Sequence, residues 1–375
     1  MTLWKHVRFP ATHIPLCLLL ALSLLLFSLT ACDVNISLEE LEKLPVEASP
    51  IPNVTRSGQW YEIYFTDPTC PPEEERYGGV DEIIAEDLLR AQQQVDVAAF
   101  DLDAEPIVNA LIDLEQQGKV LRVVTDDENE DLESIRRLRR HGTSVITDDR
   151  SGLMHNKFIV IDQRYIWTGS LNYTSNGAYC NNNNLVRLDS PELAENFNAE
   201  LDEMYIERAF GPTSPDRTPR KSVRINGVRI DNYFASEETI APIVAGLVEA
   251  AEEEILFMAF SFTHEEIGEA MLAQAAQGVA VRGVFETVGS ETPYSYYPPM
   301  AEAGLPTLVV RQDGNPQIMH HKVIIIDRDI VLLGSFNFTT NADRRNDENM
   351  LVVHDPEFAG YFVEEFELVW DEAGR

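Results

Sequence analysis

Apolar residues in the first half of the chain occur in short runs whose spacing predicts alternating strands and helices. The run at 95–100 predicts a strand, and apolar residues with helical spacing over 107–114 predict a helix. Gly118 then fits the C-terminal cap of that helix, and the run at 121–124 predicts a second strand. A strand–helix–strand order of this length predicts a parallel crossover within an α/β sheet.

The same pattern recurs 160 residues later. The runs at 255–260 and 281–284 again predict strands, and the apolar stripe over 267–275 predicts a helix that ends at Gly278. Farther along the chain the repeat spacing becomes 165, so the second half holds five extra residues, which we place in or near 286–300. The chain is therefore predicted to be a tandem α/β repeat.

The composition between the repeats indicates where they begin and end. Residues 211–222 open with a Gly, Pro and Ser-rich stretch that is typical of a linker. We therefore expect the first repeat at 60–210 and the second at 223–375. A polar, Pro-containing segment at 32–59 is typical of a tether.

The N-terminus predicts a targeting segment. Lys5 and Arg8 precede an almost wholly apolar run at 16–29, which ends in the sequence Leu-Thr-Ala followed by Cys32. This resembles a bacterial lipoprotein signal: residues 1–31 would be removed and Cys32 lipidated. The alternative is an uncleaved membrane anchor. Both interpretations place the body outside the cytoplasm, because the two basic residues stay inside.

The net charge bears on which molecules the protein can bind, and the cysteine content bears on whether it contains a disulfide. The net charge of −34 disfavours nucleic acid, whose binding depends on Lys and Arg neutralising phosphates. With Cys17 in the signal and Cys32 lipidated, Cys70 and Cys180 remain. Two such cysteines often pair in an oxidising compartment, so we expect a disulfide whose geometry the sequence cannot test.

One set of polar residues occurs in both halves at a constant spacing of 165. Each set holds a His, a Lys two residues later, an Asp, a Gly-Ser pair and an Asn. The members are His155, Lys157, Asp162, Ser170 and Asn172 in the first half, and His320, Lys322, Asp327, Ser335 and Asn337 in the second. A single His-x-Lys is weak evidence, whereas two copies with identical spacing are not expected by chance.

Local structure and side-chain chemistry give these residues a common task. Each His and Lys share one face at the start of a buried strand run, and a hairpin would return the Ser and Asn beside them. Lys supplies positive charge, Ser and Asn supply neutral donors, and His can attack phosphorus or transfer a proton. Two such sets could surround one phosphodiester. No Cys, His or carboxylate cluster with metal-ligand spacing appears in the sequence, so we expect no metal and no cofactor.

The paired motifs resemble the two HxKxxxxD motifs, each with a downstream GSxN, of the phospholipase D superfamily. The resemblance covers nearly all of residues 60–370. It implies two tandem repeats, each a mainly parallel or mixed sheet flanked by helices, packed as a pseudo-two-fold dimer with the site at their interface. It also implies a covalent phosphohistidine intermediate, and a structural role for Asp162 and Asp327.

The two halves differ 28 residues after each motif His, where the second half has Glu348 and the first has Asn183. A carboxylate beside an imidazole favours the charged form, whereas an amide can orient the ring without adding charge. We therefore predict that Asn183 orients a neutral, nucleophilic His155, and that Glu348 keeps His320 protonated as the general acid. We also expect Asn183, Ser170 and Ser335 to contact the substrate.

These observations favour a monomeric, membrane-anchored lipoprotein of a bacterial envelope that hydrolyses or transfers phospholipid phosphodiesters. An extracytoplasmic nuclease is the alternative enzyme. A catalytically silent binding protein is a third interpretation, against which the complete motifs stand.

Overall fold

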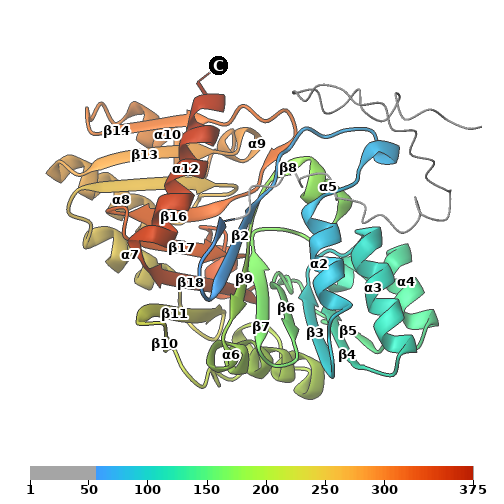
Figure 1. Cartoon of the computed structure of the whole chain (residues 1–375). Helices are drawn as coiled ribbons and strands as arrows, with labels where there is room; N and C mark the ends of the chain where they lie inside the picture. Colours follow the sequence, from blue (N-terminus) through green and yellow to red (C-terminus); the bar gives the residue numbers. More distant parts are fainter. Residues whose placement is uncertain (1–55, 375) are drawn as a thin grey trace, which may run out of the picture. The chain divides into compact units, whose positions relative to one another are not determined.

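The computed structural model describes residues 56–374, which form two α/β halves of matching topology (Figure 1). The first half has an eight-stranded mixed sheet. Its strands, in spatial order, are β1 (Arg56–Ser57), β2 (Tyr61–Phe65), β9 (Asn184–Asp189), β7 (Tyr165–Gly169), β6 (Lys157–Ile161), β3 (Gln94–Ala99), β4 (Val120–Thr125) and β5 (Val145–Thr147).

The second sheet repeats this order strand for strand. Its strands are β10 (Ser222–Ile225), β11 (Val228–Ala235), β18 (Glu348–His354), β17 (Ile330–Gly334), β16 (Lys322–Ile326), β12 (Glu254–Ala259), β13 (Ala280–Phe285) and β14 (Leu308–Gln312). The strand pairs β3–β4 and β12–β13 are parallel, as the predicted crossovers require. The predicted fold class of two tandem mixed α/β repeats is confirmed.

Helices cover both sheets. Those of the first half are α2 (Val80–Leu88), α3 (Glu105–Gln116), α4 (Glu133–Arg140), α5 (Ser175–Tyr179) and α6 (Pro191–Asp202). Those of the second half are α7 (Ala241–Glu249), α8 (Glu265–Gln277), α9 (Thr287–Ser290), α10 (Tyr297–Glu302), α11 (Thr340–Arg344) and α12 (Pro356–Glu372). Short single-turn helices lie at Glu73–Glu75, Asp127–Asn129, Glu203–Glu207 and Gly211–Thr213. Among the described residues, no helix has the length and apolar character needed to cross a membrane.

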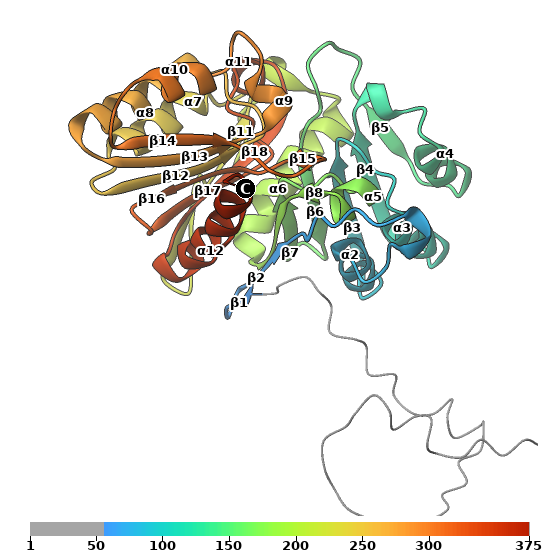
Figure 2. The same ribbon diagram turned by 90° about the horizontal axis from the view of Figure 1, so that it is seen from above.

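The buried residues form three apolar clusters that define the layers. One cluster packs α2, α3 and α4 on the outer face of the first sheet, and another packs α7 and α8 on the second (Figure 2). The largest cluster joins the inner faces of both sheets through α6 and α12. These two helices begin alike: Ser190 and Asp355 cap them through backbone N–H groups, and a Pro follows each cap. The start of each joining helix is therefore determined by the residues at its own N-terminus, in both repeats.

Local details of the repeat also agree with the sequence pattern. Gly118 and Gly278 follow the two crossover helices with φ of 73° and 105°, a left-handed conformation that glycine adopts without strain. Val123 pairs with Val145 in the first sheet, and Gly283 pairs with Val310 in the second. The repeat spacing therefore changes from 160 to 165 between β13 and β14, which confirms that the extra residues lie in this connection.

The predicted disulfide is present between Cys70 and Cys180, whose Cα atoms are 4.2 Å apart. It ties the connection between β2 and α2 to the end of α5, across 110 residues of sequence. The predicted signal segment, the lipidated Cys32 and most of the tether lie outside the described residues.

Candidate active site

Each motif His is brought to the interface by a backbone crossing between the halves. The N–H of His155 donates to the carbonyl of Asp347 at 2.9 Å, and the N–H of His320 donates to the carbonyl of Asn182 at 2.9 Å. The second crossing forms a small parallel sheet from β8 (Asn181–Asn182) and β15 (Ile318–Met319). Each motif segment therefore pairs with a segment of the opposite half.

The crossings are braced by side chains at equivalent positions of the repeat. Asn315 donates to the Oδ1 of Asn182 at 2.6 Å and to the carbonyl of Cys180 at 3.1 Å. Its counterpart 165 residues earlier, Arg150, forms an ion pair with Asp347 in the other crossing. Neither brace was singled out from the sequence, because the two positions hold different residue types, Arg and Asn, and so give no repeated motif.

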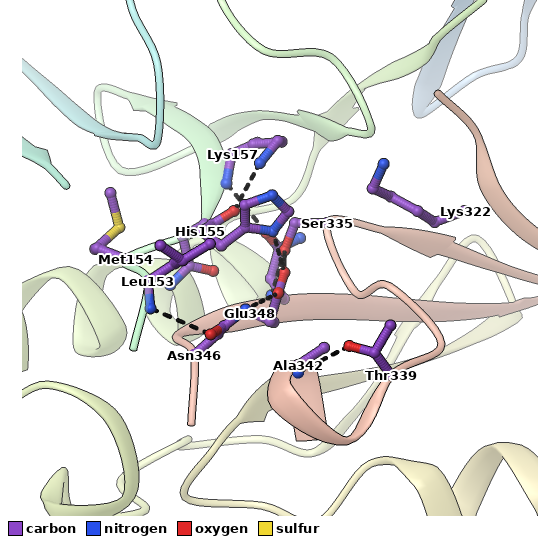
Figure 3. Close-up of polar contacts among 12 residues, drawn as sticks. Leu153, Met154, His155, Lys157, Lys322, Ser335, Thr339, Ala342, Asn346 and Glu348 are labelled. Atoms are coloured by element: carbon purple, nitrogen blue, oxygen red, sulfur yellow. Dashed lines mark hydrogen bonds and ion pairs between the residues drawn. The ribbon is translucent and has the colours of Figure 1, made fainter. Parts of the chain in front are cut away.

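The crossing decides which residue orients each imidazole. The Nδ1 of His155 lies 2.7 Å from the Oε2 of Glu348 (Figure 3). The Nδ1 of His320 lies 3.0 Å from the Oδ1 of Asn183. The predicted pairing of Asn183 with His155 and of Glu348 with His320 is therefore wrong. The spacing of 28 residues is real, but the acceptor reaches the histidine of the other half.

The motif serines also have a different role from the predicted one. Ser170 and Ser335 are fully buried and donate to Asn183 at 2.9 Å and to Glu348 at 2.7 Å. Each Ser Oγ also accepts from the backbone N–H of the residue after the orienting side chain. The prediction that these serines bind substrate is corrected, because their hydroxyls are occupied in fixing the orienting residues.

Asn183 is likewise no substrate ligand. Its side-chain oxygen accepts from Ser170 and faces His320, and its Nδ2 donates to the carbonyl of Gly177 at 3.0 Å. With 1% of its surface exposed, it has no polar atom left for a ligand. Its role is to orient an imidazole, as predicted, but the imidazole of His320.

Each motif Lys is buried beside its His and a phenylalanine. Lys157 and Lys322 donate to the carbonyl oxygens of His155 and His320 at 2.9 and 2.8 Å. The phenylalanines are Phe100, whose ring centre is 5.1 Å from the Lys157 Nζ and from the His155 ring, and Phe260, at 4.6 and 4.7 Å from the corresponding Lys322 and His320 groups. Phe100 and Phe260 were predicted only as strand ends, although their repetition at a spacing of 160 was the signal.

Burial controls the charge of the site. Desolvation lowers the pKa of His155 to about 4 despite the opposing effect of Glu348, and it lowers the pKa of Lys157 to about 7. The pKa of His320 is also lowered, first by burial and then by Lys322, Lys157 and His155. Because each half perturbs the histidine of the other, the two sets share one electrostatic environment.

Glu348 supplies the negative charge of this environment. Its burial would raise its pKa, but His155, Lys157 and a hydrogen bond from Asn346 reverse the effect and hold the pKa below its ordinary value. The ionised carboxylate can only accept a hydrogen bond, so the Nδ1 of His155 carries a proton and its Nε2 is free.

The motif aspartates have the structural role that was expected of them. Asp162 accepts three backbone N–H groups from Gln92, Gln93 and Gln94 at 2.8–3.1 Å. Asp327 accepts three from the equivalent residues 252–254. Both carboxylates thus fasten the strand that precedes the motif hairpin, away from the imidazoles.

The motif asparagines are half-buried, and the Oδ1 of each lacks a hydrogen-bond partner among the described residues. Asn337 also lines a cavity of about 670 Å³, together with Phe260, Thr263, Tyr294 and Arg345. This cavity opens beside the His320 set and is lined mostly by neutral polar side chains. The assignment of Asn172 and Asn337 to catalysis stays a prediction.

Two groups of carboxylates in the described part of the chain could hold a metal ion, which the sequence spacing did not reveal. They are Asp126, Asp127 and Asp148, and Glu200, Glu203 and Glu237, with ligand atoms within 4.8 Å of one another in each group. Several of these oxygens already have partners: Asp126 accepts the N–H of Met154 at 2.8 Å, and Glu200 accepts from Asn156 at 3.0 Å. Neither group includes a motif His or Lys.

Comparison with known proteins agrees with this geometry. A family model described as "Cardiolipin synthase, PLD-like domain" matches residues 84–205 and again residues 244–370. The mitochondrial cardiolipin hydrolase of Mus musculus is 32% identical over 36% of this chain and 60% of its own length. A phospholipase D of Rickettsia conorii is 30% identical over 39% of this chain and 78% of its own length.

Among solved structures, the phosphatidylserine synthase of Haemophilus influenzae superimposes with a TM-score of 0.63 at 13% identity, covering 86% of this chain and 88% of that one. At this identity the likeness concerns the fold alone. The family model, by contrast, matches each half separately, as a tandem repeat requires. The chain therefore belongs to the phospholipase D-like family that this domain defines.

Proposed function

We propose that the protein is a phosphodiesterase of phospholipase D type that hydrolyses or transfers phospholipid phosphodiesters through a covalent phosphohistidine. The observation that carries the proposal is the pair of buried His–Lys sets at one interface, each imidazole fixed by the opposite half. The names of the relatives, phospholipase D and cardiolipin hydrolase, support a lipid substrate.

His155 is the nucleophile in this mechanism. Its Nδ1–H donates to Glu348, so the Nε2 lone pair is free, and a pKa of about 4 keeps the ring neutral near pH 7. Attack forms an N–P bond and breaks the P–O bond to the leaving alcohol, and the imidazole becomes cationic. The buried carboxylate of Glu348 stabilises that charge as it develops.

His320 protonates the leaving oxygen. Asn183 accepts the Nδ1–H and so aims the Nε2 of His320 away from the amide. Burial and two lysines keep the pKa of His320 low before substrate binds. A bound phosphodiester anion offsets the lysines and raises the pKa of His320, so the acid form arises with substrate. The same ring then accepts a proton from the water or alcohol that resolves the intermediate.

Burial lowers the pKa of Lys157 and of Lys322, and a bound phosphate anion raises both again, so the two lysines supply positive charge to the phosphate once it binds. The motif asparagines supply amide donors. The burial of the lysines strengthens these interactions, because a low-dielectric site screens charge less than water does. Apart from the water or alcohol that resolves the intermediate, the steps use only side chains of the chain itself.

The test is a product assay of the full-length protein with mixed phospholipids and with single- and double-stranded DNA, in EDTA. Release of head group that is lost in His155→Ala supports the proposal. Cleavage of DNA without a lipid product would favour the nuclease alternative. Binding of phospholipid with no product from either substrate would favour a silent binding protein.

We also propose that the protein is held outside the cytoplasm, on a membrane of a bacterial cell envelope, by lipid on Cys32. The support is the sequence of small residues before Cys32 after an apolar run with basic residues ahead of it. Metabolic labelling with a radioactive fatty acid should mark the wild type and not Cys32→Ala. Labelling that survives the substitution would exclude this anchor.

A further inference from the structure

We propose that Thr66 is a positioning residue for His320 and acts on it through Asn183. This rests on the proposed function, in which His320 is the general acid. Thr66 follows β2 and begins the connection 66–79, which contains the disulfide cysteine Cys70.

Thr66 holds the backbone on both sides of Asn182. Its N–H donates to the carbonyl of Asn183 at 3.1 Å, and its hydroxyl accepts the N–H of Asn183 at 2.8 Å. The same hydroxyl donates to the carbonyl of Asn181 at 2.6 Å. Thr66 is 8% exposed, so water does not readily replace these bonds. These three bonds fix the backbone from which the Asn183 side chain extends. The Oδ1 at the end of that side chain lies 3.0 Å from the Nδ1 of His320.

The second half has no hydroxyl at the position equivalent to Thr66. The strand register places Phe65 opposite Asn184 and Phe234 opposite Asn349, so the counterpart of Thr66 is Ala235, which has no hydroxyl. Ala235 lies opposite Glu348. The connection that follows also differs: residues 66–79 join β2 to α2, whereas 236–240 join β11 to α7. The longer connection and the Thr66 hydroxyl therefore occur together in the first half, which also carries the Asn183 amide.

The difference has a physical reason. Glu348 is ionised and binds its imidazole through a charge-assisted hydrogen bond, which is roughly twice as strong as a neutral one. Asn183 offers a neutral oxygen, so the orientation of His320 depends more on accurate placement of the amide. Thr66 supplies that placement from the backbone.

The connection is itself fastened to the same segment. The N–H of Cys70 donates to the carbonyl of Tyr179 at 2.8 Å, and the disulfide joins Cys70 to Cys180. Arg76 donates to Ser175 at 2.9 Å. Thr66 and the disulfide therefore hold the chain on either side of Asn181.

The test compares Thr66→Val, which keeps the shape and removes the hydroxyl, with Thr66→Ser, which keeps the hydroxyl. Two substrates separate the steps: a phospholipid with an alkyl leaving group, which needs protonation, and a p-nitrophenyl phosphodiester, which needs little. We expect Thr66→Val to slow release of the leaving group in the first turnover by about tenfold or more with the phospholipid, and by less than about threefold with the p-nitrophenyl ester. KM should be unchanged, and Thr66→Ser should behave as the wild type.

A second measurement is independent of turnover. In ¹⁵N-histidine NMR spectra, His320 should hold one tautomer in the wild type, with its Nδ1 protonated, and a mixture in Thr66→Val. Equal losses on both substrates, or a His320 signal unchanged by Thr66→Val, would overturn the positioning role. If the wild type cleaves neither diester, the proposed function fails, while the His320 signals still decide the positioning.

Discussion

Replacing Glu348 with Gln tests the crossed arrangement most directly. The substitution keeps the size of the side chain and removes the negative charge 2.7 Å from the His155 Nδ1. Attack on phosphorus makes the His155 ring cationic, so the change removes a stabilising charge from the transition state and leaves neutral His155 largely unaffected. We therefore expect Glu348→Gln to slow formation of the covalent adduct.

The expected size follows from the contact and its burial. A cationic ring and a carboxylate about 4 Å apart, at an effective dielectric constant of about 20, interact by about 4 kcal/mol. Both side chains are almost fully buried, so solvent screens them little. Part of the charge has developed at the transition state, which gives a barrier increase of about 2–4 kcal/mol and a rate loss of about 30- to 1,000-fold.

The assay is stopped-flow release of p-nitrophenolate in the first turnover, which reports adduct formation alone. Glu365→Gln is the matched control. Glu365 is also buried, and its Oε1 lies 3.1 Å from the Nε2 of a histidine, His321, but it contacts neither motif imidazole. This control should leave the first-turnover rate within about threefold of the wild type. A normal burst in Glu348→Gln, or an equal loss in Glu365→Gln, would refute the charge argument.

Three other perturbations test the role of His320, the disulfide and the burial of His155. His320→Ala should release p-nitrophenolate once and then accumulate phosphorylated His155, seen by peptide mass spectrometry; a phosphorylated His320 peptide in the wild type would reverse the two roles. Reducing the disulfide between Cys70 and Cys180 should lower the free energy of unfolding by about 2–4 kcal/mol in denaturant titrations, and an unchanged midpoint would contradict this. Burial lowers the pKa of His155 from 6.5 to about 4, so the unfolded chain binds a proton in this window that the folded chain does not. Stability should therefore fall by up to about 3 kcal/mol as pH falls from 6.5 to 4, and His155→Gln should flatten that slope.

The features that depend on neighbouring residues were predicted well from the sequence. Runs of apolar residues located the repeated strands, and the spacing of 165 identified both His–Lys sets. The structural role of Asp162 was implied by the resemblance to the phospholipase D superfamily, and its partners lie on the adjacent strand β3 and the residues just before it. These features repeat within each half, so a comparison of the halves reveals them.

The contacts between the halves could not be obtained in this way. The repeat shows that Glu348 follows His320 at the same spacing as Asn183 follows His155. It does not show whether each acceptor contacts the histidine of its own half or that of the other half. The backbone crossings at Asn182 and Asp347 decide the question, and they depend on how the two sheets pack. In the proposed mechanism, the exchange of acceptors places the carboxylate beside the histidine that carries positive charge after attack. The amide remains with the histidine that must give up its proton, and for that task a weaker acceptor is the better partner.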